Sequence, residues 1–163
     1  WLPKELILFN NCNLKRKINF NLSKDSNLLL CENIIFGRTS MKEEFEKGYF
    51  SDFWNINIDK ELIHTEAINT NLFEKKYLNS FSTLNNNSAV ATIIIVGNKF
   101  LNNVNNLSET LTNNENTTSN YSQWDNKLIL RLLSKDSYNL KFAIDKILSY
   151  FFEGSKIPKV WNI

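Results

Sequence analysis

The sequence predicts a mainly β protein: a β-rich assembly of stacked sheets with two helices in its C-terminal third. Apolar and polar residues alternate along much of the first 68 residues, which is typical of strands with one face in water. A helical period of apolar residues begins only at residue 100. The 163 residues are 42% hydrophobic, which is enough for the core of a single domain. This pattern fits both a sandwich and a solenoid-like, β-helix-like stack.

The first part of the chain contains three expected strands, at residues 5–9, 14–22 and 28–36. In the second strand, Arg16 and Ile18 share the apolar face, and Lys15 and Lys17 lie on the other face. The third strand is nearly continuously apolar, as expected for a strand that is covered on both faces. A carboxylate, Glu32, lies near its centre.

Three more strands are expected in the middle of the chain, at residues 50–58, 61–68 and 89–96. Asp59 and Lys60 form a tight turn between the first two of these. The strand at 89–96 is rich in Val and Ile, which favours burial. The charged segment 39–47 is expected to form one or two helical turns. The weakly patterned segment 69–87 is expected to hold one near 72–78.

The last third changes to a mixed α/β pattern. It is expected to contain a helix at 100–111, a polar loop at 113–120, a strand at 128–133 and a helix at 138–153. Ser137 is the expected N-cap of the last helix, and Gly154 is expected to end it.

The composition argues against several classes of protein. Nineteen Lys and Arg residues against 17 Asp and Glu give a net charge of +2, whereas nucleic-acid binding modules usually carry a larger, clustered excess of positive charge. The longest apolar run, 89–97, is about half the length that crosses a bilayer. Two isolated cysteines without a secretion signal suit a reducing cytosol. We therefore expect a cytoplasmic protein that binds neither membranes nor nucleic acid.

His64 is the only imidazole in the chain, so a Ser-His-Asp or Cys-His arrangement would have to use it. It lies within an expected strand on the same face as Leu62 and Glu66, whereas catalytic groups favour loops. No GxSxG, P-loop or GxGxxG motif is present. The sequence thus predicts no enzyme activity, with a cytosolic hydrolase that uses His64 as the alternative.

Glu32 is the most informative polar residue, because a charged carboxylate within an apolar strand needs a partner or water. Arg38 is the nearest arginine in the sequence, and we expect it to hold Glu32 bidentately. Either this is a structural ion pair, or Glu32 lies at a water-filled passage or a subunit interface. Cys31 and Glu32 are adjacent and point to opposite faces of a strand. Because Cys31 and Glu32 cannot bind one ion together, the sequence predicts no tightly bound metal.

Several segments together resemble the urease accessory protein UreD family, called UreH in some organisms. They are Trp1-Leu2-Pro3-Lys4-Glu5 with Phe9, Glu32 with Phe36-Gly37-Arg38 and Met41, Asp52-Phe53-Trp54, Ala89-Val90-Ala91-Thr92 with Val96-Gly97, Trp124-Asp125 with Leu130-Arg131-Leu132, and Ile157-Pro158-Lys159-Val160-Trp161. The stretch from Glu32 to Met41 is similar to the family's most specific motif. The match covers residues 1–163 as a single UreD-like domain, the C-terminal two thirds of the family's length. Since the chain begins with Trp1 and not Met, we expect that an N-terminal part is missing.

The resemblance implies a non-enzymatic scaffold for urease maturation. Proteins of this family bind the urease apoprotein and UreF, which recruits UreG, and the assembly inserts nickel into the urease active site. It also implies a β-rich, helix-like stack of strands with two helices. Nickel is expected to be handled transiently, without a tightly bound cofactor. The residues expected at a nickel passage or an interface are Glu32, Arg38, Cys31, Asp52 and Glu66.

Overall fold

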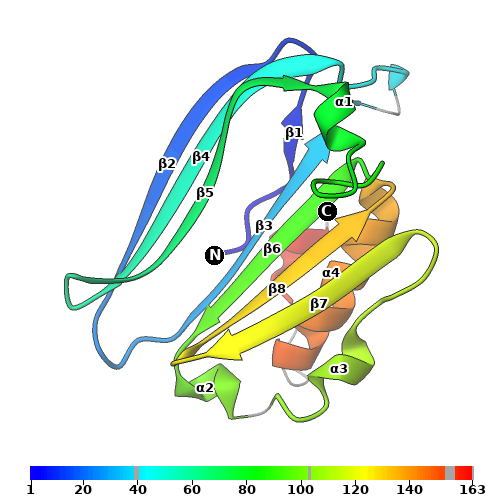
Figure 1. The fold of residues 1–163 in the computed structure, drawn as a ribbon. Helices are drawn as coiled ribbons and strands as arrows, with labels where there is room; N and C mark the ends of the chain where they lie inside the picture. The colour runs from blue at the N-terminus through cyan, green and yellow to red at the C-terminus, as the bar shows by residue number, and fades with distance from the viewer. Residues whose placement is uncertain (39–40, 103, 153–156, 163) are drawn as a thin grey trace.

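The computed structural model describes residues 1–38, 41–102, 104–152 and 157–162. They form three layers: a long helix, α4 (Ser137–Phe152), a five-stranded sheet and a three-stranded sheet. Figure 1 shows α4 across one face of the larger sheet, and the smaller sheet on the opposite side. Within the described residues, no helix is long and apolar enough to cross a membrane.

The larger sheet has the strand order β1-β3-β6-β8-β7. Its strands are β1 (Leu6–Leu8), β3 (Leu28–Phe36), β6 (Ala89–Val96), β7 (Thr117–Trp124) and β8 (Lys127–Ser134). The three central strands are rich in Leu, Ile and Val, since they are covered on both faces. Only the short strand β1 is parallel to its neighbour.

The smaller sheet has the order β2-β4-β5. Its strands are β2 (Asn13–Leu22), β4 (Lys47–Ile58) and β5 (Glu61–Glu74). The first four strands alternate between the two sheets: β1 and β3 belong to the larger sheet, and β2 and β4 belong to the smaller one. Within each sheet the two strands pair in parallel. This winding is that of a β-helix, so the first four strands confirm the β-helix-like expectation.

Three short helices occupy connections between strands, and a short 3₁₀ helix follows α4. They are α1 (Lys75–Leu78), α2 (Asn98–Leu101), α3 (Leu107–Thr110) and the 3₁₀ helix η2 (Lys159–Asn162). The helix η2 is fixed against α4, because Trp161 is buried and its Nε1 donates a hydrogen bond of 2.7 Å to Asp145 Oδ1.

The apolar core is divided between the two layers of contact. The apolar face of α4 packs on one face of the larger sheet, including Cys31, Ile93 and Leu130. The opposite face of that sheet forms two separate apolar clusters with the smaller sheet, one around Ile34 and Phe50 and the other around Leu30, Trp54 and Ile94.

The mainly β architecture is confirmed, and the most strongly patterned strands have the expected bounds. The strands at 28–36 and 89–96 begin and end where the sequence predicts. Those at 5–9, 14–22, 50–58 and 128–133 differ by one to three residues at an end.

One helix prediction is wrong, and a second is met only by a short 3₁₀ turn. Met41 has 3₁₀ conformation, and its backbone N–H donates a hydrogen bond of 2.8 Å to the carbonyl oxygen of Arg38. Residues 42–47 form no helix: Arg38 pairs with Glu43 as an isolated antiparallel bridge, while residues 39 and 40 lie outside the described part. Segment 100–111 is not one helix, because α2 ends at Leu101 and α3 begins only at Leu107. The asparagine-rich residues between them favour local side-chain hydrogen bonds over a continuous helix.

The strand β7 is the largest omission, because residues 113–120 were expected to be a loop. Its sequence is almost entirely polar, and it lies at the edge of the sheet with most of its side chains exposed. It pairs with β8 through a turn in which Asp125 has a φ of 49°. Likewise, β5 continues to Glu74 beyond the expected end at Ile68, and the helical turn begins at Lys75.

The last helix begins one residue earlier than expected. Asp136 is its cap, since Asp136 Oδ1 accepts a hydrogen bond of 2.7 Å from the backbone N–H of Asn139. Ser137 is therefore the first helical residue and not the N-cap. The expected end at Gly154 lies outside the described residues.

Candidate functional site

A row of polar residues crosses the centre of the larger sheet. Glu32 on β3 is paired in register with Thr92 on β6, and Thr92 is paired with Arg131 on β8. Residues in register on neighbouring strands point to the same face. Their face is the one that meets the smaller sheet, because Cys31 and Ile93, one position away, pack against the helix layer.

At one end of this row, Arg16 on β2 joins two carboxylates. Its Nε and Nη2 donate hydrogen bonds of 2.9 and 2.6 Å to the two oxygens of Asp52 on β4, and Nη2 also lies 2.9 Å from Glu32 Oε2. Trp1 Nε1 donates to the other oxygen of Glu32 at 2.7 Å. The side chains of Glu32 and Asp52 are only 2% and 1% exposed, so Arg16 compensates charges that would otherwise be costly to bury.

At the other end, Arg131 joins the larger sheet to β5. Its two terminal nitrogens lie 2.9 and 2.6 Å from the two oxygens of Glu66, and Nη1 donates to Thr92 Oγ1 at 2.7 Å. The ring of His64 lies next to Glu66, with 3.5 Å between Nε2 and Oε2. Such a bidentate pair fixes both direction and distance between the sheets.

We call these residues the polar band. It consists of Arg16, Glu32, Asp52, His64, Glu66, Thr92 and Arg131. The polar band lies between the two apolar clusters of the sheet interface: Ile34 and Val90 belong to one cluster, and Leu30 and Ile94 to the other. A row of charge thus divides an interface that is otherwise apolar.

The charges of the polar band interact strongly. Burial alone raises the pKa of Glu66, but contacts with His64 and Arg131 outweigh it, so this pKa lies below its ordinary value. Burial alone lowers the pKa of Arg16, but hydrogen bonds and charge from Asp52 and Glu32 raise it overall. Both effects favour the charged forms, so the band holds two guanidinium groups against three carboxylates.

Two buried nitrogen atoms, one within the polar band and one next to it, have no hydrogen-bond partner among the described residues. They are Trp54 Nε1 and His64 Nε2. Trp54 is 2% exposed, and the guanidinium of Arg16 lies 5.8 Å from the centre of its ring. Buried polar atoms of this kind mark places where a further hydrogen-bonding group is favoured.

The structure brings together three of the five predicted passage residues. Glu32, Asp52 and Glu66 belong to the polar band, whereas Arg38 does not. The expectation that Arg38 holds Glu32 is wrong: Arg38 donates to Glu43 Oε2 through Nε at 2.7 Å, and its guanidinium lies 4.4 Å from the ring centre of Phe9. The neighbour in sequence was the wrong choice because a strand places distant residues side by side.

Cys31 lies on the other face of β3, as its position next to Glu32 requires. It is fully buried in the cluster under α4, and this burial raises the pKa of its thiol to about 12. Cys31 therefore does not contribute to the polar band, and a neutral thiol is a poor ligand for metals.

Sequence reasoning placed Arg16 on the apolar face of its strand without assigning it a role. A cation on the inward side of an alternating strand is itself a signal, since an inward charge needs a buried partner. His64 was expected on the same face as Leu62. That is wrong, because a β-bulge next to Ile56 shifts the register, and Leu62 is 57% exposed whereas the His64 side chain is 12% exposed.

The motif residues fall into two groups. The buried ones are Phe36, Gly37, Trp54 and Trp161, and the exposed ones are Met41, Trp124, Asp125, Arg131 and Pro158. Gly37 has a φ of 87°, and a Cβ atom there would lie 2.8 Å from the carbonyl oxygen of Glu43. The glycine is required because the chain turns sharply here between β3 and the following segment.

The polar band is a set of paired charges. Within the part of the chain that the structure describes, no three His, Cys, Asp or Glu side chains converge to hold a metal ion. The carboxylates of the band are occupied by arginines, which act as internal counter-ions. His64 contacts Glu66 and, among the described residues, has no recorded contact with a serine or a cysteine.

Comparison with known proteins decides the family. The sequence model described as UreD urease accessory protein matches residues 1–162. The chain belongs to the UreD family. The resemblance in the motifs is thereby confirmed.

Individual relatives agree with this assignment. The urease accessory protein UreD of Rhizobium leguminosarum bv. viciae is 32% identical over 166 residues, which cover all of this chain and 59% of that protein. UreD of Agrobacterium fabrum strain C58 is 29% identical over 167 residues and is covered to 56%. UreD of Granulibacter bethesdensis is 40% identical over 95 residues, or 58% of this chain and 40% of that protein. The chain thus spans about three fifths of the length of the first two UreD relatives.

Proposed function

We propose that this chain acts in urease maturation as a non-catalytic accessory protein. The observation that carries the proposal is the UreD family match over residues 1–162, together with relatives that are named urease accessory proteins. Its partners are the urease apoprotein and UreF, with UreG bound through UreF. A cytosolic hydrolase that uses His64 is the weaker candidate, since no serine or cysteine among the described residues contacts the ring, as a nucleophile would.

Nickel is the cargo in this proposal, and the polar band is the part of the chain that would handle it. The band provides three carboxylates between two sheets, and oxygen ligands bind divalent ions weakly enough for release when no thiolate or imidazole cluster joins them. A passing Ni²⁺ would compete with Arg16 for Glu32 and Asp52. Glu32 thus has a role in passage, whereas Arg38 and Cys31 have none.

The experiment that tests the maturation role is complementation. The gene that encodes this chain is expressed with the urease subunits, UreF and UreG in a host that lacks its own UreD. We expect urease activity, nickel in the purified urease, and co-purification of the chain with UreF. Inactive, nickel-free urease together with a lack of co-purification would contradict the proposal.

The passage is tested separately in the same host. Glu32→Gln keeps the size of the side chain and removes its charge, and we expect it to reduce the nickel content of urease while UreF still co-purifies. Lys17→Gln on the exposed face of β2 is the matched control and should match the parent. Full nickel loading by Glu32→Gln would remove this residue from the mechanism, but not the chain from the family. Likewise, loss of nickel insertion in a His64→Ala chain would favour an active role for that ring.

A further inference from the structure

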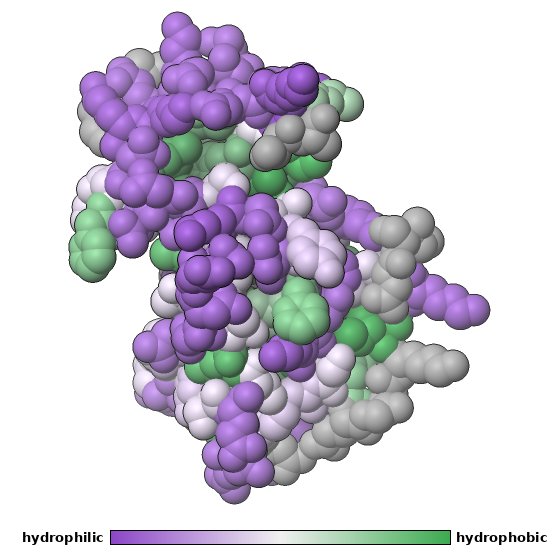
Figure 2. Space-filling view, turned by 90° about the vertical axis from the view of Figure 1, so that its right-hand side faces the viewer, coloured by the Kyte–Doolittle hydropathy of each residue, from purple (hydrophilic) through white to green (hydrophobic). Residues whose placement is uncertain are grey.

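A second feature of the chain is a groove of about 530 Å³ at the end of the sheets, far along the strands from the turn at Asp59. It lies where β3 and β8 end, between the segment 42–45 on one side and residues 79–88 on the other. Figure 2 shows hydrophobic side chains at the bottom of a hollow between two hydrophilic parts of the surface. We call it the end groove.

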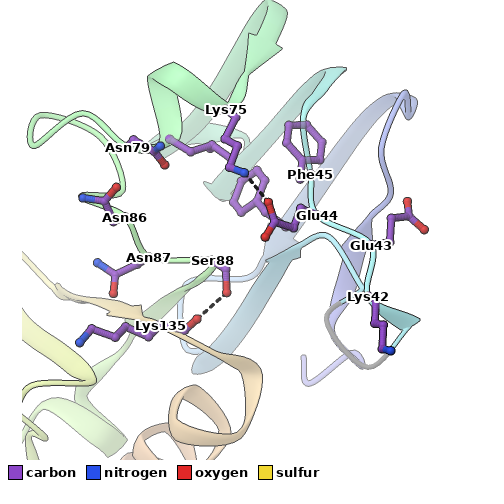
Figure 3. A pocket seen from close by; sticks show the side chains of 12 residues that line it. Lys42, Glu43, Glu44, Phe45, Lys75, Asn79, Asn86, Asn87, Ser88 and Lys135 are labelled. Atoms are coloured by element: carbon purple, nitrogen blue, oxygen red, sulfur yellow. Dashed lines mark hydrogen bonds and ion pairs between the residues drawn. The ribbon is translucent and has the colours of Figure 1, made fainter.

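The floor of the end groove is apolar and its rim is polar. Phe36, Phe45 and Leu78 line it from below, and each is less than 10% exposed. Figure 3 shows that asparagine side chains line one side of the groove, and that Lys75, Ser88 and Lys135 come from different segments around it. An apolar floor within a polar rim is the usual anatomy of a site for a protein segment.

The acidic side chains of the rim are already neutralised. Arg38 pairs with Glu43, and Lys75 lies against both Glu44 and Glu46. By contrast, the ammonium groups of Lys42 and Lys135 have no ion-pair partner in the described residues, although both line the groove. The unsatisfied charge of the end groove is therefore positive, and it favours carboxylates.

The amide groups of the rim favour a polypeptide over a small anion. The side chains of Asn79 and Asn86 line the groove and make no hydrogen bond with other described residues. Each side-chain amide offers a donor and an acceptor, as a peptide group does. Asn85 and Asn86 have φ angles of 47° and 60°, and asparagine adopts this left-handed conformation more readily than most residues.

We propose that the end groove binds an extended segment of a partner protein in which acidic side chains alternate with apolar ones. The apolar side chains rest on Phe36, Phe45 and Leu78, and the carboxylates meet Lys42 and Lys135. This site lies outside the polar band, and none of its lining residues belongs to it. The proposal therefore stands independently of the role in urease maturation.

The probe is a fluorescein-labelled synthetic peptide of alternating Leu and Asp, titrated with the 163-residue chain and followed by fluorescence anisotropy. A peptide with Lys in place of Asp is the matched probe. We expect the acidic peptide to bind and the basic one not to bind. The double variant Lys42→Glu/Lys135→Glu should bind the acidic peptide about tenfold or more weakly, because each reversal replaces attraction by repulsion.

Two controls separate this site from non-specific attraction and from misfolding. Lys15→Glu/Lys17→Glu makes the same change of charge on the exposed face of β2 and should leave the affinity unchanged. The groove variant should gain affinity for the basic peptide, which a misfolded chain would not do selectively. Equal binding of both peptides, equal effects of the two double variants, or displacement by inorganic phosphate alone would overturn the proposal.

Discussion

Arg131 on β8 and Glu66 on β5 face each other across the two sheets, and both oxygens of the carboxylate are bound by the one guanidinium group. The contact connects the edge strand of the smaller sheet to the centre of the larger one. Arg16 makes the equivalent connection from β2 and β4 to β3. Each sheet thus supplies one arginine and receives one from the other.

Removal of Arg16 is expected to destabilise the chain strongly. Arg16→Met keeps an apolar stem and leaves Glu32 and Asp52 buried without their cation. The free energy of unfolding should fall by about 3–5 kcal/mol, as measured by urea denaturation. Lys17→Met on the exposed face of the same strand is the control and should change it by less than about 0.5 kcal/mol.

A compensating variant tests whether charge causes this loss. The triple variant Arg16→Met/Glu32→Gln/Asp52→Asn removes the uncompensated carboxylates and should recover a large part of the lost stability. If it is no more stable than Arg16→Met alone, packing and not charge is responsible.

The stability of the chain should depend on pH through Glu66. Its pKa is lower in the folded chain than its ordinary value of 4.5, so the unfolded chain binds this proton more readily. The contribution is complete above pH 4.5 and is lost as the pH falls through the lower folded value. We expect the stability difference between the parent and Glu66→Gln to shrink as the pH falls across this range. Thermal unfolding of both chains at each pH measures this difference. A difference that is constant with pH would contradict the assignment.

The two cysteines should differ in reactivity. Cys31 is fully buried with its pKa raised to about 12, whereas Cys12 is partly exposed. Since the thiolate is the reactive form, iodoacetamide should modify Cys12 in the folded chain and both residues in denaturant, as measured by mass spectrometry. The folded Cys12→Ser variant, in which Cys31 is the remaining thiol, should stay unmodified. If iodoacetamide labelled this variant as fast as the parent, the core beneath α4 would be accessible to solvent, which would contradict the prediction.

Gly37→Ala is expected to destabilise the turn after β3. The residue has a φ of 87°, and the added Cβ would meet the backbone of Glu43 and Phe45 within 2.9 Å. The cost should be about 1–3 kcal/mol, measured as a lower midpoint of urea unfolding. Ser122→Ala on the exposed edge strand should leave the midpoint unchanged.

The fold could be predicted where the pattern reflects burial. The strands β3 and β6 have both faces covered, so their apolar runs mark their limits. The polar edge strand β7 gives no such signal, because pairing with β8 holds it while most of its side chains remain exposed. Local rules also failed at 100–111, where only α2 and α3 form.

The site was predictable only in part, for a related reason. The unusual position of Glu32 identifies one member of the polar band from sequence alone, because a buried carboxylate needs a partner. Its partner, Arg16, lies on β2 of the smaller sheet, and the packing of the two sheets places it against Glu32 on β3. That distance along the chain is not encoded in any local pattern, and the nearest arginine in sequence, Arg38, instead holds Glu43.

The division of the sheet interface by charge also restricts how the two layers align. Two entirely apolar surfaces could slide over each other. Leu30 and Ile34 lie two residues before and after Glu32, and they would make similar apolar contacts in a slipped arrangement. With the charged row in place, a slip by two residues would separate Arg16 from Glu32 and Arg131 from Glu66, the two ion pairs that cross between the sheets. We therefore expect mutants that neutralise the whole row to fold with several offsets of one sheet over the other.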